Sequence, residues 1–162
     1  MSSRHERKIK EGARPFLEEG EEVLAGFVAR PRGWTRSAAA AGVGGLGGAV
    51  GRELGARQQS QAHTGAEQAE FRLESPMALA VTQRRLLVLK ISSPIGLGIG
   101  GDVKELVSAV PVGDVDSVEV KRLLLGKTVT VTVRGVPFKL EANALADASG
   151  LAEAFSRTKA AA

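Results

Sequence analysis

Six basic residues fall in predicted turns and strand ends of the chain: Arg84, Arg85, Lys90, Lys121, Arg122 and Lys127. Lysine and arginine side chains hold phosphates and carboxylates through charge-assisted hydrogen bonds, and arginine offers a planar fork of donors. Four of the six form the candidate anion-binding set: Arg84, Arg85, Lys121 and Arg122. The alternative is a solvated basic surface that balances carboxylates such as Asp114 and Glu119, because blocks of charge commonly serve only solvation.

Residue types that support most enzyme chemistry are scarce. The chain has no Cys and no Tyr, and its two histidines, His5 and His63, lie in polar segments outside the predicted strands. This composition excludes thiol nucleophiles, disulfide bonds and cysteine-based zinc sites. It also leaves no histidine in place for a Ser–His–Asp arrangement. We therefore expect a protein that is not an enzyme, with no catalytic residues, no metal site and no cofactor.

A glycine-rich loop, Gly96-Leu-Gly-Ile-Gly-Gly101, matches the pattern G-x-G-x-x-G. A dinucleotide site requires a helix that begins at this loop, whereas the following residues, 103–110, predict a strand. We instead assign the loop's three large apolar residues, Ile95, Leu97 and Ile99, to an apolar contact loop. They either fold back over the sheet or form an exposed tip that contacts a membrane surface or a partner.

Residues 37–75 are rich in Ala, Gly and Gln and differ from the rest of the chain. Gly47, Gly51 and Gly55 are spaced by four, so on a helix they share one face and allow another backbone to approach closely. Such a face could dock a helix or drive self-assembly. Because glycine disfavours an isolated helix, the segment without a packing partner would be loosely ordered.

Most of the remaining chain predicts antiparallel strands. Residues 22–29 and 128–134 show the alternation of a half-buried strand, and Val129, Val131 and Val133 share one face. The further strands are expected at 77–82, 85–92, 103–111, 115–123 and from residue 136 onward. A short helix is expected at 4–19, where Gly20 would end it.

The chain ends in an amphipathic pattern. Five apolar residues form one helical stripe: Leu145, Ala148, Leu151, Ala152 and Phe155. Asn143 is the expected N-cap, because its side-chain oxygen can accept a hydrogen bond from a free backbone N–H of the first turn. We expect this helix to cover an open end of the sheet and to complete its core.

Seven short antiparallel strands followed by one helix resemble the bacterial pleckstrin-homology-like domain, especially small actinobacterial proteins of that type. The residues that carry the likeness are Leu17-Glu-Glu-Gly-Glu-Glu-Val-Leu24, Ala80-Val-Thr-Gln-Arg-Arg-Leu-Leu-Val88 and Val110-Pro-Val-Gly-Asp-Val-Asp-Ser-Val118, with the final strand pair and helix. The resemblance covers about residues 15–34 and 76–159. It implies a mainly β fold of the α+β class, a seven-stranded antiparallel barrel capped by the C-terminal helix.

The resemblance also implies an organisation and a role. We expect an N-terminal helix in 1–21, a pleckstrin-homology-like domain in 22–159, and an insertion in 37–75 that is helical or disordered. The implied role is a binding module that presents loops and a basic surface to a protein partner or an anionic membrane surface. The alternative is a structural protein that self-assembles into a homo-oligomer through the Gly47, Gly51 and Gly55 face.

Charge and hydropathy constrain partners and location. The 162-residue chain has a formal net charge of +4, which permits contact with phosphates without requiring it. Only 4% of residues are aromatic, so base stacking is poorly supported and no nucleic acid is expected. The N-terminus lacks the apolar stretch of a secretory signal, and the charge-free run 37–51 is shorter than a membrane span. We expect a cytoplasmic protein, or one peripheral at the membrane.

Overall fold

The computed structural model describes residues 4–33, 46–68, 71–74, 76–92, 101–124, 126–142 and 146–162. The strands are β1 (Val23–Pro31), β2 (Met77–Thr82), β3 (Arg85–Ile91), β4 (Val103–Pro111), β5 (Val115–Leu123), β6 (Gly126–Val133) and β7 (Val136–Ala142). The helices are α1 (Arg4–Ala13), α3 (Leu46–Gln68) and α4 (Ala148–Ala161), with short 3₁₀ turns η1 (Arg14–Phe16) and η2 (Val112–Asp114). This content confirms the predicted fold class, including its C-terminal helix.

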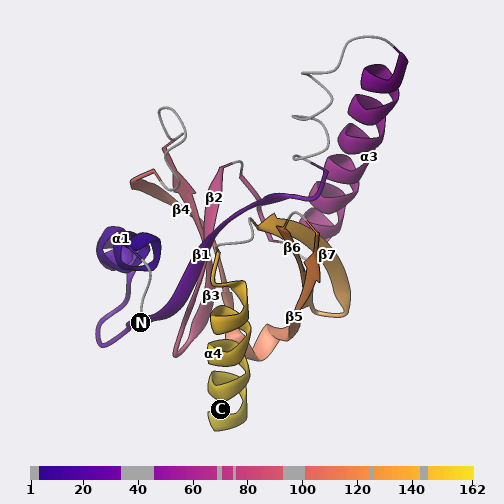
Figure 1. Ribbon diagram of the computed structural model, residues 1–162. Coiled ribbons are helices and arrows are strands. Elements are labelled where there is room, and N and C mark those ends of the chain that lie inside the picture. Colours follow the sequence, from indigo (N-terminus) through magenta and orange to yellow (C-terminus); the bar gives the residue numbers. More distant parts are fainter. Residues whose placement is uncertain are drawn as a thin grey trace.

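The seven strands form one antiparallel sheet in the order β4-β3-β2-β1-β7-β6-β5. β1 joins the two halves, because Val23–Ala29 pair with β2 whereas Arg30 and Pro31 pair with β7. The sheet bends at this strand, so that its two halves face each other (Figure 1). β4 and β5 are the two ends of the order and do not pair with each other in the described structure, so the predicted barrel is an open one.

The main core lies between the two halves of the sheet, and α4 packs against it. Val129, Val131 and Val133 are fully buried there, as their alternation predicts. From α4, Leu151 and Phe155 join the same core, which confirms that the helix covers the sheet opening. Lys159 secures the end of this helix by donating a hydrogen bond to the Val115 carbonyl oxygen at the start of β5.

The N-cap of α4 differs from the expected one. The helix begins at Ala148, and Asp147 is its N-cap: Oδ1 accepts a hydrogen bond of 2.9 Å from the Gly150 N–H. Asn143 and Leu145, the expected cap and first stripe residue, lie outside the described residues. An aspartate satisfies a free N–H as well as asparagine does, and its charge also favours the positive end of the helix dipole.

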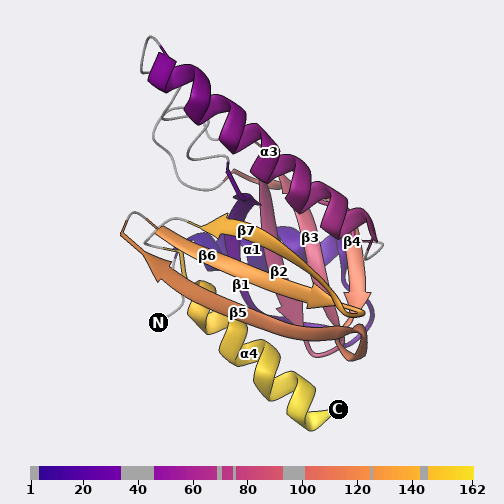
Figure 2. The same ribbon diagram turned by 90° about the vertical axis from the view of Figure 1, so that its right-hand side faces the viewer.

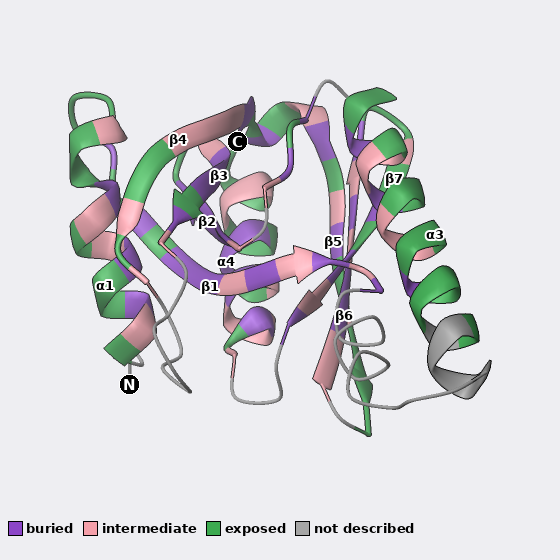
Figure 3. Ribbon diagram, turned by 90° about the horizontal axis from the view of Figure 1, so that it is seen from above, coloured by how far each residue is buried: buried purple, intermediate pink, exposed green. Residues whose placement is uncertain are grey.

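A second, smaller core lies on the opposite face of the β1–β4 half, beneath α1. Ile9 and Ala13 of α1 pack against residues such as Ala78 and Leu87, so β2 and β3 are buried on both faces (Figure 3). Gly26 allows this close approach, because a Cβ there would lie 3.1 Å from Cγ2 of Ile9. The helix expected at 4–19 is therefore shorter than predicted: it ends at Ala13, before Pro15, since proline disfavours helical geometry in the residue that precedes it.

The segment between β1 and β2 contains the long helix α3, whose small residues pack on the chain's own sheet. Ala62 and Ala66 join the main core, and Gly65 lies against the Phe138 side chain of β7. Phe71, just after the helix, contacts the Phe138 ring with 5.1 Å between centroids. The N-terminal half of α3 extends beyond the sheet (Figure 2).

None of the helices in the described ranges is both long and apolar enough to cross a membrane.

Candidate anion-binding surface

The strand register separates the four predicted anion-binding residues into two pairs. Arg84 and Arg85 lie at the turn between β2 and β3, next to Thr82, which pairs with Val23 at the start of β1. Lys121 belongs to a row that runs through Thr128 and Glu141 to Arg30, near the end of β1. The two pairs therefore lie at opposite ends of the strands, and no single ligand of phosphate size contacts all four.

Arg85 is held by a buried carboxylate. Its guanidinium binds Glu21 in a bidentate manner, with Nη2–Oε2 at 2.5 Å and Nε–Oε1 at 3.0 Å. The Thr82 hydroxyl donates a third hydrogen bond to the same carboxylate, at 2.6 Å. The Arg85 hydrogen bonds lower the pKa of Glu21 to about 2, against the opposing effect of burial and with help from Thr82. The same pair raises the pKa of Arg85, so both groups stay charged.

Arg84 also faces acidic groups, although more loosely. Its Nη1 lies 3.5 Å from Oε2 of Glu18, and both side chains are more than half exposed. Glu18 also lies 3.5 Å from Nη1 of Arg85. Two arginines thus face two glutamates at this turn. Because their charges balance, the turn offers little net attraction for an external anion.

The β5–β6 hairpin has the opposite character. Lys121 and Arg122 are exposed at the end of β5, and Arg122 lies directly opposite Lys127 across the ladder. Like charges in directly opposed positions destabilise a strand pair. Lys127 turns aside and donates a hydrogen bond of 2.6 Å to the Ala146 carbonyl oxygen. In the described part of the chain, no salt bridge joins any of these three cations to a carboxylate.

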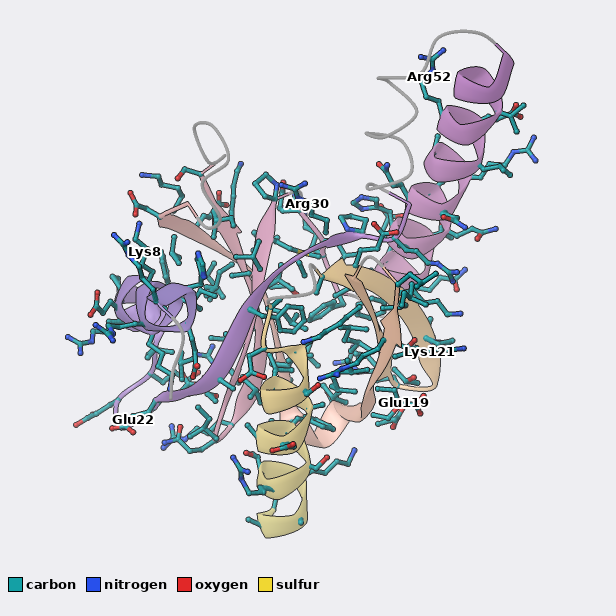
Figure 4. The ribbon with its side chains drawn as sticks, viewed as in Figure 1. Lys8, Glu22, Arg30, Arg52, Glu119 and Lys121 are labelled. Atoms are coloured by element: carbon teal, nitrogen blue, oxygen red, sulfur yellow. The ribbon has the colours of Figure 1, made fainter. Side chains whose placement is uncertain are left out.

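Carboxylates do occur farther along the same strands. Glu119 precedes Lys121 by two residues and shares its outer face of β5, where both side chains are labelled in Figure 4. Glu141 lies two strands away in the row of Lys121, and its Oε1 accepts a hydrogen bond of 2.8 Å from the Gly33 N–H. Next to it, burial lowers the pKa of Arg30. The cationic character is therefore concentrated at the hairpin end rather than spread over the whole face.

The tip of this hairpin is apolar, a feature that the sequence analysis missed. Leu123 is 55% exposed and Leu124 is fully exposed, at 102% of its reference area. The signal in the sequence is a run of leucines between Arg122 and Gly126, where a turn between two strands must fall. The apolar loop that was expected instead, with Ile95, Leu97 and Ile99, lies outside the described residues.

The glycine face of α3 has a partner within the chain for part of its length. The Gly55 carbonyl oxygen lies so close to Gly33 that a Cβ there would be 2.3 Å away. Gly33, whose φ is +96°, lies two residues after the end of β1. Gly55 is thus occupied by the chain itself, whereas the surroundings of Gly47 and Gly51 lie outside what the structure describes.

Solved structures that match this chain include two from bacteria. One is a DUF1696 family protein with a pleckstrin-homology domain from Shewanella loihica, at 10% sequence identity and a TM-score of 0.46, covering 97% of this chain and 99% of that chain. The other is a pleckstrin homology domain from Shewanella amazonensis, at 11% identity and a TM-score of 0.45, covering 94% and 96%. No family model matches the chain, and no curated protein matches its sequence.

The seven antiparallel strands and the C-terminal helix of this chain match the element order that the resemblance of the sequence implies. The actinobacterial part of the expectation stays a prediction, as do the boundaries of the N-terminal helix, domain and insertion.

Proposed function

We propose that this chain is a non-catalytic binding module that attaches peripherally to an anionic membrane surface through Lys121, Arg122 and Lys127. The observation that carries the proposal is the direct opposition of Arg122 and Lys127, beside exposed Lys121, with no carboxylate from the described residues paired to any of the three. An anionic surface relieves this repulsion. Each basic residue near such a surface contributes about 1 kcal/mol, and the attraction declines within a Debye length.

The second basic pair of the original prediction does not support this role equally. Arg85 is mostly buried and bound by Glu21, and Arg84 faces Glu18. Moving Arg85 to an external phosphate would leave the buried Glu21 without its cation, and the charge of Arg84 is already balanced by Glu18. We therefore place the anionic contact at the β5–β6 hairpin and assign Arg84 and Arg85 to structural ion pairs.

Co-sedimentation with vesicles tests the proposal. The full chain should bind vesicles of phosphatidylcholine mixed three to one with phosphatidylserine, and it should bind vesicles of phosphatidylcholine alone much more weakly. The double variant Lys121→Gln/Arg122→Gln should lose about tenfold or more in affinity for the anionic vesicles, from two contributions of about 1 kcal/mol. Raising the salt concentration should weaken the wild type more than this variant.

A matched control removes the same charge elsewhere. Lys139→Gln/Arg157→Gln neutralises two exposed cations on β7 and α4, and it should change the affinity much less. Equal losses in the two double variants would mean that only net charge matters. No binding of the wild type to anionic vesicles would rule out the membrane and favour a protein partner.

A second candidate function, self-association, rests on the projecting half of α3. Val50 and Leu54 are 57% and 42% exposed there, four residues apart on one side of the helix. Light scattering of the wild type and of Val50→Glu/Leu54→Glu tests it. A wild-type oligomer that the variant dissociates would support assembly through α3, whereas a wild-type monomer would exclude it at the concentrations measured.

A further inference from the structure

We infer that Leu123 and Leu124 form an insertion tip, which enters the boundary between headgroups and acyl chains of an anionic bilayer while Lys121 and Arg122 contact the lipid phosphates. This inference rests on the proposed membrane function and adds its apolar half. It assigns a lipid-binding role to two residues that the fold itself does not use.

Neither leucine contributes to a core. Leu123 and Leu124 belong to neither of the two hydrophobic clusters, although most large apolar residues described in the chain do. Leu123 lies opposite Gly126, the first residue of β6, which has no side chain to cover it. When a ligand buries an apolar residue that the folded protein leaves in water, the burial favours binding. Function at the surface, rather than folding, therefore accounts for these side chains.

The order of residues along β5 matches the layers of a membrane surface. Extended chain advances about 3.3 Å per residue, so Arg122 and Lys121 lie about 7 and 10 Å behind Leu124. Interfacial segments bury their apolar residues about 5–10 Å into the boundary between headgroups and acyl chains. When Leu124 reaches that depth, the two cations are at the level of the phosphates. The apolar tip and the basic residues behind it can therefore contact one anionic bilayer at the same time.

The size of the patch favours lipid over a protein groove. A stable protein interface buries about 800 Å² on each partner, with an apolar centre and a polar rim. Here two leucines project from a hairpin whose nearest neighbours are Lys121, Arg122 and Lys127. No wider apolar surface continues from the tip along the described outer face, where β6 presents the half-buried threonines Thr130 and Thr132. Lipid requires no complementary shape, so a narrow tip suffices.

Site-specific fluorescence measures insertion directly. Because the chain has no Cys, Leu124→Cys can be labelled at that position alone with nitrobenzoxadiazole, a dye that brightens and shifts to the blue in apolar surroundings. Anionic vesicles of three parts phosphatidylcholine to one part phosphatidylserine should produce both changes. The control label at Val50→Cys, an exposed apolar position on α3, should show neither. A dye at residue 124 that stays in water while the protein is bound would overturn the inference.

A substitution provides the second measurement. Leu123→Ser/Leu124→Ser should weaken binding to anionic vesicles by about tenfold, since a buried leucine contributes appreciably to transfer from water. Its thermal melt should stay close to that of the wild type, because neither side chain belongs to a hydrophobic core. The control Val50→Ser/Leu54→Ser should bind as the wild type does. If Leu123→Ser/Leu124→Ser binds anionic vesicles as tightly as the wild type, the insertion tip is wrong. The proposed basic contact would still stand in that case if Lys121→Gln/Arg122→Gln binds weakly. If the wild type does not bind anionic vesicles, both proposals are refuted.

Discussion

At the residue scale, Glu21 shows how a carboxylate can be buried and remain charged. Its side chain is fully buried, yet it accepts two hydrogen bonds from Arg85 and one from Thr82. Hydrogen bonds to the charged form of a carboxylate lower its pKa and offset desolvation. The ion pair also links the loop after α1 to the β2–β3 turn, across 64 positions of sequence. Glu21 therefore helps to hold the N-terminal segment on the sheet.

The first prediction concerns this ion pair. Glu21→Gln should lower the free energy of unfolding at pH 7 by about 3 kcal/mol, as expected when a pKa is lowered from 4.5 to about 2. The free energy of unfolding is measured in urea. The control Glu19→Gln removes an exposed carboxylate of the same loop and should change stability by less than about 0.5 kcal/mol.

The pH dependence of the same pair follows from the sign of the shift. Because the pKa of Glu21 is lower in the folded protein than in the unfolded chain, its contribution is fully present above about pH 5. It is lost progressively as the pH falls from about 4.5 towards 2. The stability difference between wild type and Glu21→Gln should therefore shrink across that interval. A difference that stays constant down to pH 2 would show that the carboxylate is not the stabilising group.

At the element scale, the packing of α3 depends on a glycine at the end of β1. Gly33 combines a φ of +96° with the close Gly55 carbonyl oxygen, and its N–H donates to Glu141. Positive φ is accessible to glycine at little cost, whereas other residues rarely adopt it. The backbones of the strand end and the helix can approach each other this closely only because Gly33 lacks a side chain.

Gly33→Ala should therefore lower the free energy of unfolding by about 2–3 kcal/mol, combining backbone strain with displacement of α3. Gly113→Ala is the matched control, because no atom lies within 4 Å of the added Cβ and its φ is unexceptional. Urea denaturation compares the two variants. Similar small losses for both would mean that α3 is not packed at Gly33.

The C-terminal helix permits a third stability prediction. Phe155 is 3% exposed within the main core, so Phe155→Ala should cost about 3–5 kcal/mol through lost burial and a cavity. Arg157→Ala, on the exposed side of the same helix, should cost less than about 0.5 kcal/mol. A thermal melt of Phe155→Ala that coincides with that of Arg157→Ala would contradict the role of α4 in the core.

At the scale of the whole molecule, the sequence predicts those helices and strands that have a clear local periodicity. The alternation in 128–134 and the apolar stripe through Leu151 and Phe155 locate β6 and α4 well, and these elements are confirmed. The sequence does not predict how both faces of β2 are covered. The apolar run of this strand, Met77–Thr82, does not indicate which element packs on its second face. That depends on α1, which comes more than 60 positions earlier.

The candidate site shows the same limit. Basic residue types are visible in the sequence, but the register decides that Arg85 faces Glu21 whereas Arg122 faces Lys127. Charges that look equivalent along the chain thus become an internal ion pair at one end of the sheet and an unbalanced cluster at the other. The exposed leucine tip was missed for the same reason, since a leucine run is more typical of a core until its place in the hairpin is known.

The most direct test of this account maps where a membrane touches the whole chain. Hydrogen–deuterium exchange of the full protein, with and without anionic vesicles, reports every backbone segment in one experiment. We predict slower exchange confined to the β5–β6 hairpin, with the β2–β3 turn at Arg84 and Arg85 unchanged. Slower exchange at that turn or along α3, with none at the hairpin of bound protein, would contradict it.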